Sequence, residues 1–486
     1  MTRQGRRSRR DATEEPSDSI GDTKADLVTQ IEFLGARACD SDLTQVERHE
    51  AESRLFALWR GYEENGGVWT PRTYARLGGS FRSTDPLLAY EVFAAGLEHF
   101  PANQALRYQQ GLTLVRLGSH QRALEIATRL ASEQIDDAGL STDVLGLIAR
   151  LDKDRALAAT DPADRQKYLE RALAGYRDAF NRAHFGFKSY PAINAATMAL
   201  LSGDSALAGE LAKEARRHAE TELVTAGRNT HWQIATIAEA SFVLGEMERA
   251  EEHYREAVRV AGRRFDDIGS MRRNARVIAE HFGEGGGWIE DVLRLPAVVV
   301  FTGHMIDMPD REQPRFPPML ESSIAAAIEK QLQALNAGFG FSGAACGSDI
   351  LFLEAMLKRG HIHIVLPFDT DQFVKSSVAL TPESTWPARF RHLLDQAENV
   401  QIASGAPSDW GGIVFEYANL LLLGLAELRS RALDTELVGR AVWDGNPGDG
   451  PGGTAETVRS WRERGLKVVE ISPRPYLERM GADVSQ

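Results

Sequence analysis

The sequence has little cysteine: Cys39 and Cys346 are the two in a chain of 486 residues. Two cysteines this far apart do not provide the disulfide framework of a small secreted protein. A long hydrophobic run is also lacking, because the most apolar segment, residues 420–426, is far shorter than the ~20 residues of a membrane-spanning helix. No apolar leader follows the arginine-rich start. These absences predict a cytoplasmic protein that does not enter a membrane.

Positive charge is in deficit, with 56 Lys and Arg against 69 Asp and Glu and a formal net charge of -13. Such a chain repels polyanions unless it carries a local basic patch, and no patch is evident in the segments expected to fold. The arginines within the first ten residues are followed at once by acidic residues, which is typical of a solvated tail. We therefore expect no nucleic-acid partner and assign residues 1–22 to a disordered tail.

Residues 23–288 carry apolar residues three or four positions apart, which predicts an almost wholly helical region. Three stretches share a pattern in which a turn glycine is followed five residues later by an alanine. These pairs are Gly118 and Ala123, Gly203 and Ala208, and Gly245 and Ala250. The glycine permits the left-handed backbone that ends a helix, and the alanine lets the next helix pack closely. The pattern predicts antiparallel helix pairs stacked into an array.

A different pattern begins after the glycine-rich break at residues 283–287. Short apolar runs alternate with longer helical segments, as in a parallel sheet covered by helices on both faces. The expected strands are 297–302, 339–342, 362–367, 400–403, 438–443 and 468–471. The predicted fold class is therefore α plus α/β, with the second domain at 295–473 and a C-terminal tail at 474–486. Ligands of such sheets bind at the carboxyl ends of the strands.

The first two strands end in glycine-containing loops. Gly303 allows a ligand to approach the backbone, and His304 either donates to a phosphate or ribose or merely caps its loop. After the second strand, small residues expose backbone amides in front of a helix at 350–359, where a partial positive charge attracts anions. The candidate ligand contacts in this loop are Ser342, Gly343, Gly347 and Asp349. A plain N-cap role for Ser348 or Asp349 is the alternative.

The third candidate loop is residues 443–454, which are dense in glycine and aspartate and precede a helix at 455–464. Its bent backbone presents free amides beside a helix start, which favours an anionic ligand. The candidates are Asp444, Gly445, Gly452, Gly453 and Thr454. A flexible surface loop is the alternative. A metal site through Asp444 and Asp449 is disfavoured, because two carboxylates without further ligands bind metal poorly; no metal is predicted.

Two motifs of the C-terminal half resemble a known superfamily. SGAACGSDILFLEAMLKRG at 342–360 and PGGT at 451–454 are similar to the small-residue loop and the phosphate loop of the SLOG superfamily of Rossmann-like nucleotide-binding domains. The resemblance implies a nucleotide or nucleotide-derived ligand; the sequence identifies no other cofactor. The implied contacts are Gly303, Ser342, Gly343, Gly347, Asp349, Gly452, Gly453 and Thr454.

The enzymes of that superfamily known as Lonely Guy phosphoribohydrolases have a glutamate three residues after the loop threonine. This chain has Thr457 there, and Glu456 lies one residue early. Loss of a positioned carboxylate removes a group that stabilises charge as a glycosidic bond breaks. The resemblance therefore implies a sensor more than an enzyme. A nucleotide hydrolase using Asp349 or Glu456 remains the alternative.

The helical half resembles tetratricopeptide repeats, since GEMERAEEHYREAV at 245–258 fits the second helix of that family. The turn glycines are 85 and 42 residues apart, which departs from the ~34-residue period. YPAIN at 190–194 is similar to the TRAFs-binding domain of the apoptosis-signal-regulating kinases. The whole arrangement looks like the TPR-S class of signalling proteins, which implies that the helices bind a protein partner. A scaffold that has lost its ligand is a further alternative.

Overall fold

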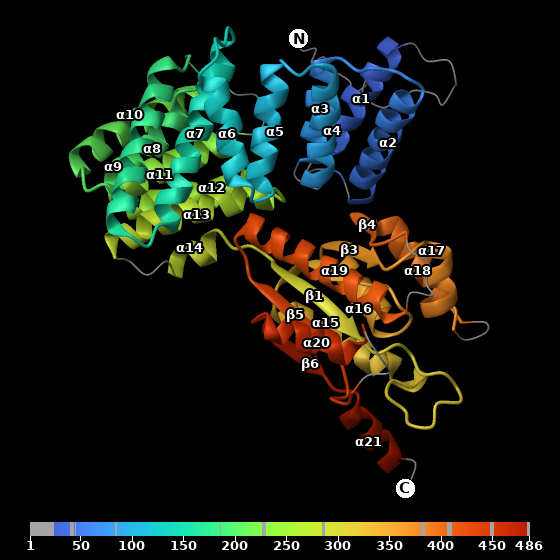
Figure 1. The fold of residues 1–486 in the computed structure, drawn as a ribbon. Coiled ribbons are helices and arrows are strands. Elements are labelled where there is room, and N and C mark those ends of the chain that lie inside the picture. Colours follow the sequence, from blue (N-terminus) through green and yellow to red (C-terminus); the bar gives the residue numbers. More distant parts are fainter. Residues whose placement is uncertain are drawn as a thin grey trace, which may run out of the picture.

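The computed structural model describes residues 24–38, 43, 45–82, 85–184, 186–225, 230–283, 287–380, 384–405, 411–447 and 452–483. An array of helices comes first and an α/β domain follows it (Figure 1). The predicted tail at 1–22, Cys39 and Asp449 lie outside the described residues. In the part of the chain that is described, no helix has both the length and the apolarity needed to cross a bilayer.

The helical array consists of α1 to α14, in which consecutive helices pack against each other. Their bounds are α1 Lys24–Ala38, α2 Gln45–Glu64, α3 Pro71–Phe81, α4 Pro86–His99, α5 Gln104–Arg116, α6 His120–Ala131, α7 Ala138–Ala158, α8 Pro162–Arg182, α9 Ser189–Leu201, α10 Ser205–Thr225, α11 His231–Val243, α12 Met247–Ala261, α13 Phe265–Phe282 and α14 Gly287–Val292. Helices α7 to α12 form three neighbouring pairs, α7 with α8, α9 with α10 and α11 with α12 (Figure 1).

The turn glycines of the array adopt the left-handed conformation that the sequence predicts. Gly118, Gly203 and Gly245 have φ of 75°, 86° and 78°. The residue after each turn glycine donates its amide back into the preceding helix, as in Ser119 N to Leu114 O at 2.8 Å. The three alanines that follow are buried with at most 1% exposure. Both parts of the predicted helix-pair motif are confirmed.

The α/β domain contains six parallel strands in the order β4-β3-β2-β1-β5-β6. The strands are β1 Ala297–Gly303, β2 Ala337–Ser342, β3 His361–Leu366, β4 Asn399–Ile402, β5 Leu437–Val442 and β6 Val468–Ile471. The helical elements are η1 Pro318–Leu320, α15 Glu321–Ala334, α16 Ser348–Leu357, α17 Thr370–Phe373, η2 Val374–Val378, α18 Trp386–Gln396, α19 Gly412–Leu433, α20 Thr454–Glu463 and α21 Arg474–Asp483. The predicted fold class and all six strands are confirmed.

Helices cover both faces of the sheet. Val299 and Phe301 of β1 pack with residues of α15, α16 and α18. Val298 and Val300, which alternate with them, pack with residues of α19 and α20 on the other face. Such alternation along one strand, with apolar residues at every position, is expected where a parallel strand is buried on both sides.

Residues 474–483, which lie in the segment predicted to be a C-terminal tail, form helix α21. Tyr476 and Leu477 on this helix pack against the core that contains α15 and α16. This segment is therefore part of the folded domain. It lies at the end of the α/β domain away from the helical array (Figure 1).

The array is joined to the α/β domain through α13 and the end of α19. A Cβ on Gly269 of α13 would lie 2.6 Å from Leu433 O, so only glycine permits this approach. Arg276 Nη1 donates to Asp434 Oδ2 at 2.5 Å, and Arg272 donates to the Asp434 carbonyl. The two parts of the chain therefore meet in a close backbone contact between α13 and α19, which hydrogen bonds from two arginines stabilise.

Candidate functional site

The strand order places a topological switch point between β1 and β5. From β1 the chain builds β2, β3 and β4 on one side and then returns to β5 on the other side. The crevice outside the carboxyl ends of two such strands is where open parallel sheets bind ligands. His304 follows β1 and Asp444 comes two residues after the end of β5. His304 Nε2 lies 3.1 Å from Asp444 Oδ1, with both side chains buried. Two predicted site residues therefore meet at the switch point.

Asp444 is the anchor of the β5 turn. Asn446 donates its amide to Asp444 Oδ1 at 3.1 Å and its side chain to Oδ2 at 2.7 Å, and Gly445 between them has a φ of 83°. Burial opposes ionisation of Asp444, but the Asn446 amide and His304 outweigh it and lower the pKa of the carboxyl. Burial lowers the pKa of His304. At neutral pH the pair is a carboxylate beside a neutral imidazole.

The β1 and β2 turns pack directly on one another. Ser348 Oγ donates to His304 O at 2.8 Å, and Gly347 pairs with Met305 as an isolated bridge. A Cβ on Gly303 would lie 2.3 Å from Ser348 Oγ. Ser342 is fully buried. Gly303, Ser342 and Gly347 thus make this close packing possible instead of lining an open cavity.

Three amides of the small-residue loop after β2 already have acceptors within the domain. Cys346 N donates to Ser377 O at 2.8 Å, and Ser348 N donates to His304 O at 3.2 Å. Ala345 N points to Asp349 Oδ2 at 3.4 Å. The alternative N-cap role does not hold for Ser348 or Asp349, because the N-cap of α16 is Gly347, with a φ of 107° and no side-chain hydrogen bond.

Among the aspartates at the carboxyl ends of the strands, Asp349 has the most strongly shifted pKa. Its Oδ1 is buried with no hydrogen-bond partner among the described residues. Its Oδ2 would lie 3.0 Å from a Cβ on Gly343. Burial raises the pKa of Asp349 to about 7, and the amides of Ala345 and Gly303 only partly oppose it. This carboxyl is therefore close to half protonated at neutral pH.

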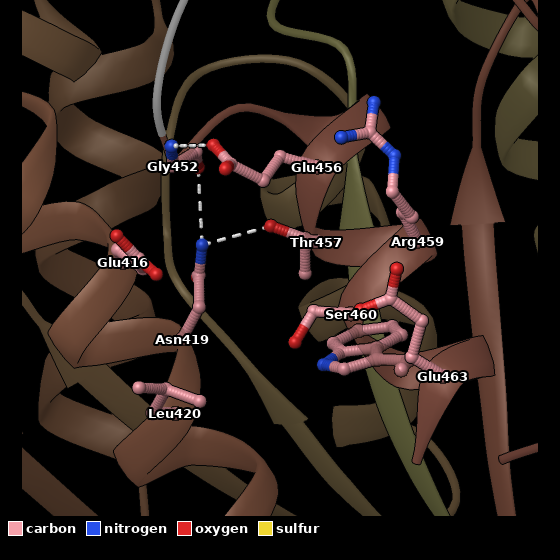
Figure 2. Close-up of a pocket in the computed structure, with 10 residues that line it drawn as sticks. Glu416, Asn419, Leu420, Gly452, Glu456, Thr457, Arg459, Ser460 and Glu463 are labelled. Carbon is pink, nitrogen blue, oxygen red and sulfur yellow. Dashed lines mark hydrogen bonds between the residues drawn. The ribbon is translucent and has the colours of Figure 1, made fainter. Parts of the chain in front are cut away.

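The glycines before α20 are held by side chains of two helices (Figure 2). Gly453 is the N-cap of α20 and Thr454 is its first residue. Glu456 Oε2 accepts the Gly452 amide at 2.8 Å. Asn419 of α19 donates to Gly452 O at 3.0 Å and to the Thr457 hydroxyl at 2.9 Å. Glu456, a candidate catalytic residue, caps the turn before its own helix here.

A pocket of about 200 Å³ lies between α19 and α20 (Figure 2). Its charged lining consists of Glu416, Glu456, Glu463 and Arg459. Three carboxylates against one guanidinium make a negative pocket, which disfavours a phosphate. The predicted phosphate loop therefore borders an acidic pocket.

A larger pocket of about 450 Å³ borders the switch point. Its charged lining is Arg311 and Arg315 from the loop after β1, Arg474 from the start of α21, and Asp444. Asn446 lines it as well. Three guanidiniums against one carboxylate make this pocket positive. Of the predicted site residues, Asp444 lines this pocket, Gly452 and Glu456 line the acidic one, and none of the others lines either.

The loop that carries two of these arginines is anchored to the domain. Asp307 is buried, and its Oδ2 accepts the amides of Arg315 and Phe316, both at 2.8 Å. Phe316 is fully buried in the core. Arg311 Nε lies 3.5 Å from Asp307 Oδ1. Sequence reasoning missed the arginines because the loop lacks periodicity; the signal that could have found them is their position after the ends of β1 and β6.

One family model matches the chain, that of the Tetratricopeptide Repeats-Sensor family, over residues 87–199. These residues run from α4 to α9. The helical array is tetratricopeptide-like. The match ends before the α/β domain, so the resemblance of that domain to the SLOG superfamily stays a prediction, as does the TRAFs-binding-domain resemblance. No curated protein matches the chain.

Three of the solved structures that are similar to this chain illustrate how distant the likeness is. A thermophilic tetratricopeptide protein of Thermus thermophilus is 19% identical, with 43% of this chain and 98% of that chain covered and a TM-score of 0.33. The Cut9–Hcn1 hetero-tetramer of the APC/C is 10% identical, with 76% of this chain and 55% of that chain covered and a TM-score of 0.35. A human IFIT1 dimer with PPP-AAAA is 15% identical, with 84% of each chain covered and a TM-score of 0.30.

Proposed function

We propose that this protein is an intracellular signalling sensor or adaptor. Its α/β domain binds a nucleotide-derived ligand at the switch point between β1 and β5, and its helical array binds a protein partner. The observation that carries the proposal is the pocket of about 450 Å³ that arginines line at this point. Its volume falls in the range of ~300–1,000 Å³ that is usual for small-molecule sites.

Helix α19 supports a link between the ligand site and the array. It packs on β1 and β5, the strands that bound the switch point, and at its end Leu433 packs on Gly269 of α13. The 22 residues of this helix span roughly 33 Å at 1.5 Å per residue. If the ligand binds more tightly when α19 is in one of two positions, binding shifts this helix and with it the contact to the array. The coupling free energy equals the difference in binding free energy between the two positions.

Apolar side chains at one end of the α9–α11 region support the partner-binding half of the proposal. Phe187 is 74% exposed, Tyr190 is 52% exposed and Trp232 is 42% exposed. Glu222 of α10 ties the start of α9 in place by accepting the amide of Lys188 at 3.0 Å. Exposed aromatic residues on a fixed backbone are typical of protein interaction sites.

One observation favours the hydrolase alternative. The Asp349 carboxyl, with a pKa raised by burial to about 7, is suited to exchange a proton at neutral pH. It lines neither pocket. Release of free base from nucleoside monophosphates by the full chain, lost in Asp349→Asn, would establish this activity. An equal rate with and without the protein would exclude it for those substrates.

Titration calorimetry of the full chain against nucleotides, dinucleotides and cyclic dinucleotides tests the sensor proposal. We expect at least one of these compounds to bind with a dissociation constant in the micromolar range or below. Pull-down with the exposed aromatic residues substituted tests the partner half. Absence of heat across the whole panel, with the protein shown to be folded, would refute ligand sensing.

A further inference from the structure

The two pockets of the α/β domain carry opposite charges. The residues that line the pocket at the glycine loop include one arginine and three glutamates, an excess of two negative charges. The residues that line the switch-point pocket include three arginines and one aspartate, an excess of two positive charges, which the ion pair of Arg311 with buried Asp307 reduces. A phosphate is attracted by the switch-point pocket and repelled by the pocket at the glycine loop. The charge difference therefore selects the switch-point pocket for anionic groups.

One amide of the glycine loop already has an anionic acceptor. The Gly452 amide already donates to Glu456 Oε2 at 2.8 Å. A phosphate at that position would displace a carboxylate from the same donor and lie beside it. An arginine side chain carries several N–H groups in a plane that matches phosphate oxygens two at a time.

Inside the switch-point pocket the acidic and basic groups come from different elements. Arg311 and Arg315 belong to the anchored loop after β1, and Arg474 begins α21. Asp444 and Asn446 follow β5 and are tied to each other. One wall therefore attracts phosphate, and the other presents carboxylate and amide oxygens that accept hydrogen bonds from hydroxyl groups.

From this separation we infer that the switch-point pocket binds a ribonucleoside diphosphate group, with the diphosphate on Arg311, Arg315 and Arg474 and a ribose hydroxyl on Asp444. This rests on the proposed function and narrows it to one ligand class. At neutral pH a terminal diphosphate carries about three negative charges and a terminal monophosphate about two, so the three guanidiniums attract the diphosphate more strongly.

The test uses the full chain and titration calorimetry with inorganic pyrophosphate, the four ribonucleoside diphosphates, their monophosphates and their nucleosides. The variants are Arg315→Gln and Arg474→Gln. The matched control is Arg479→Gln, an exposed arginine of the same helix α21 that stacks over Tyr476 outside the pocket. Thermal unfolding confirms that each variant is folded.

We expect at least one diphosphate to bind at least tenfold more tightly than its monophosphate and the nucleosides to give no measurable binding. Each pocket variant should weaken diphosphate binding by about tenfold or more, the usual effect of losing a charge-assisted hydrogen bond. Arg479→Gln should bind as the natural protein does. A 2′-deoxy diphosphate should bind several-fold more weakly than the ribo form.

The outcomes separate the two claims. Nucleotides that bind equally to the pocket variants and to Arg479→Gln would overturn the arginine site and leave the sensor function standing. A monophosphate that binds as tightly as the diphosphate would overturn the ligand class. Pyrophosphate that binds through the arginines while every nucleotide fails would uphold the anion site and overturn the nucleotide function. Failure of all compounds would overturn both.

Discussion

Replacing Asp349 with asparagine tests whether the carboxyl edge of β1 and β2 is as closely packed as the structure indicates. The pKa of this carboxyl rises from 3.8 to about 7 because the group is buried. The folded state therefore holds the proton more tightly than the unfolded state. Its stabilising effect is complete below the unfolded pKa and is lost as the pH rises through the folded pKa.

The magnitude follows from the size of the shift. At 1.36 kcal/mol for each pH unit, a rise from 3.8 to about 7 corresponds to about 4 kcal/mol in the free energy of unfolding. About half of it, roughly 2 kcal/mol, is lost between pH 5.5 and pH 8. Asparagine has the same shape and does not ionise, so the Asp349→Asn variant should gain roughly 2 kcal/mol relative to the natural protein over this range.

Urea unfolding of the full chain at several pH values measures this difference. Tryptophan fluorescence and circular dichroism should be followed together, because a chain with two folded parts need not unfold in one step. Asp395→Asn, at an exposed carboxylate of α18, is the control and should follow the natural protein at every pH. Parallel pH profiles for Asp349→Asn and the natural protein would refute the buried, raised-pKa carboxyl.

Three further substitutions test other parts of the structure. Gly269→Ala places a methyl group 2.6 Å from Leu433 O and should lower the stability in thermal unfolding by about 1–3 kcal/mol through overpacking. The control is Gly209→Ala in α10, where the added methyl group has its nearest contact at 3.9 Å and should be neutral or stabilising. Equal effects of the two variants would contradict the close contact between α13 and α19. Asn419→Ala removes two hydrogen bonds from the start of α20 and should cost about 1–2 kcal/mol in urea unfolding; no loss would show that these bonds are absent in solution. Lys153→Met removes a buried donor from the side-chain oxygens of buried Asn194 and partly buried Asn274 and should lower the unfolding temperature by several degrees. An unchanged temperature would argue against these hydrogen bonds.

The strands were predictable because parallel strands that are buried on both faces have continuous apolar sequences. Residues 297–301 are such a run. The start of β2 was missed by two residues because Ala337 and Gly338 carry no strand preference; Gly338 is there because Pro296 leaves no room for a side chain. His361 at the start of β3 was missed as well, because its burial depends on Glu398, 2.7 Å away. These positions are set by tertiary contacts.

The candidate site was predictable only in part. The loops after β1 and β5 were identified by glycine and by strand position, and the meeting of His304 with Asp444 agrees with that expectation. The closure of the β2 turn was not visible, because it depends on the Ser348 hydroxyl reaching across to another loop. Arg315 and Arg474 are 159 residues apart, and no spacing rule connects them before the sheet brings β1 and β6 to one edge.

Hydrogen–deuterium exchange of the full chain with and without saturating ribonucleoside diphosphate shows which of the two pockets holds the ligand. We expect slower exchange at residues 304–317, 443–447 and 472–478, which border the switch-point pocket, and little change at 416–420 and 454–463, which border the acidic one. Protection confined to the acidic pocket, or absent from both while the nucleotide binds, would contradict this expectation.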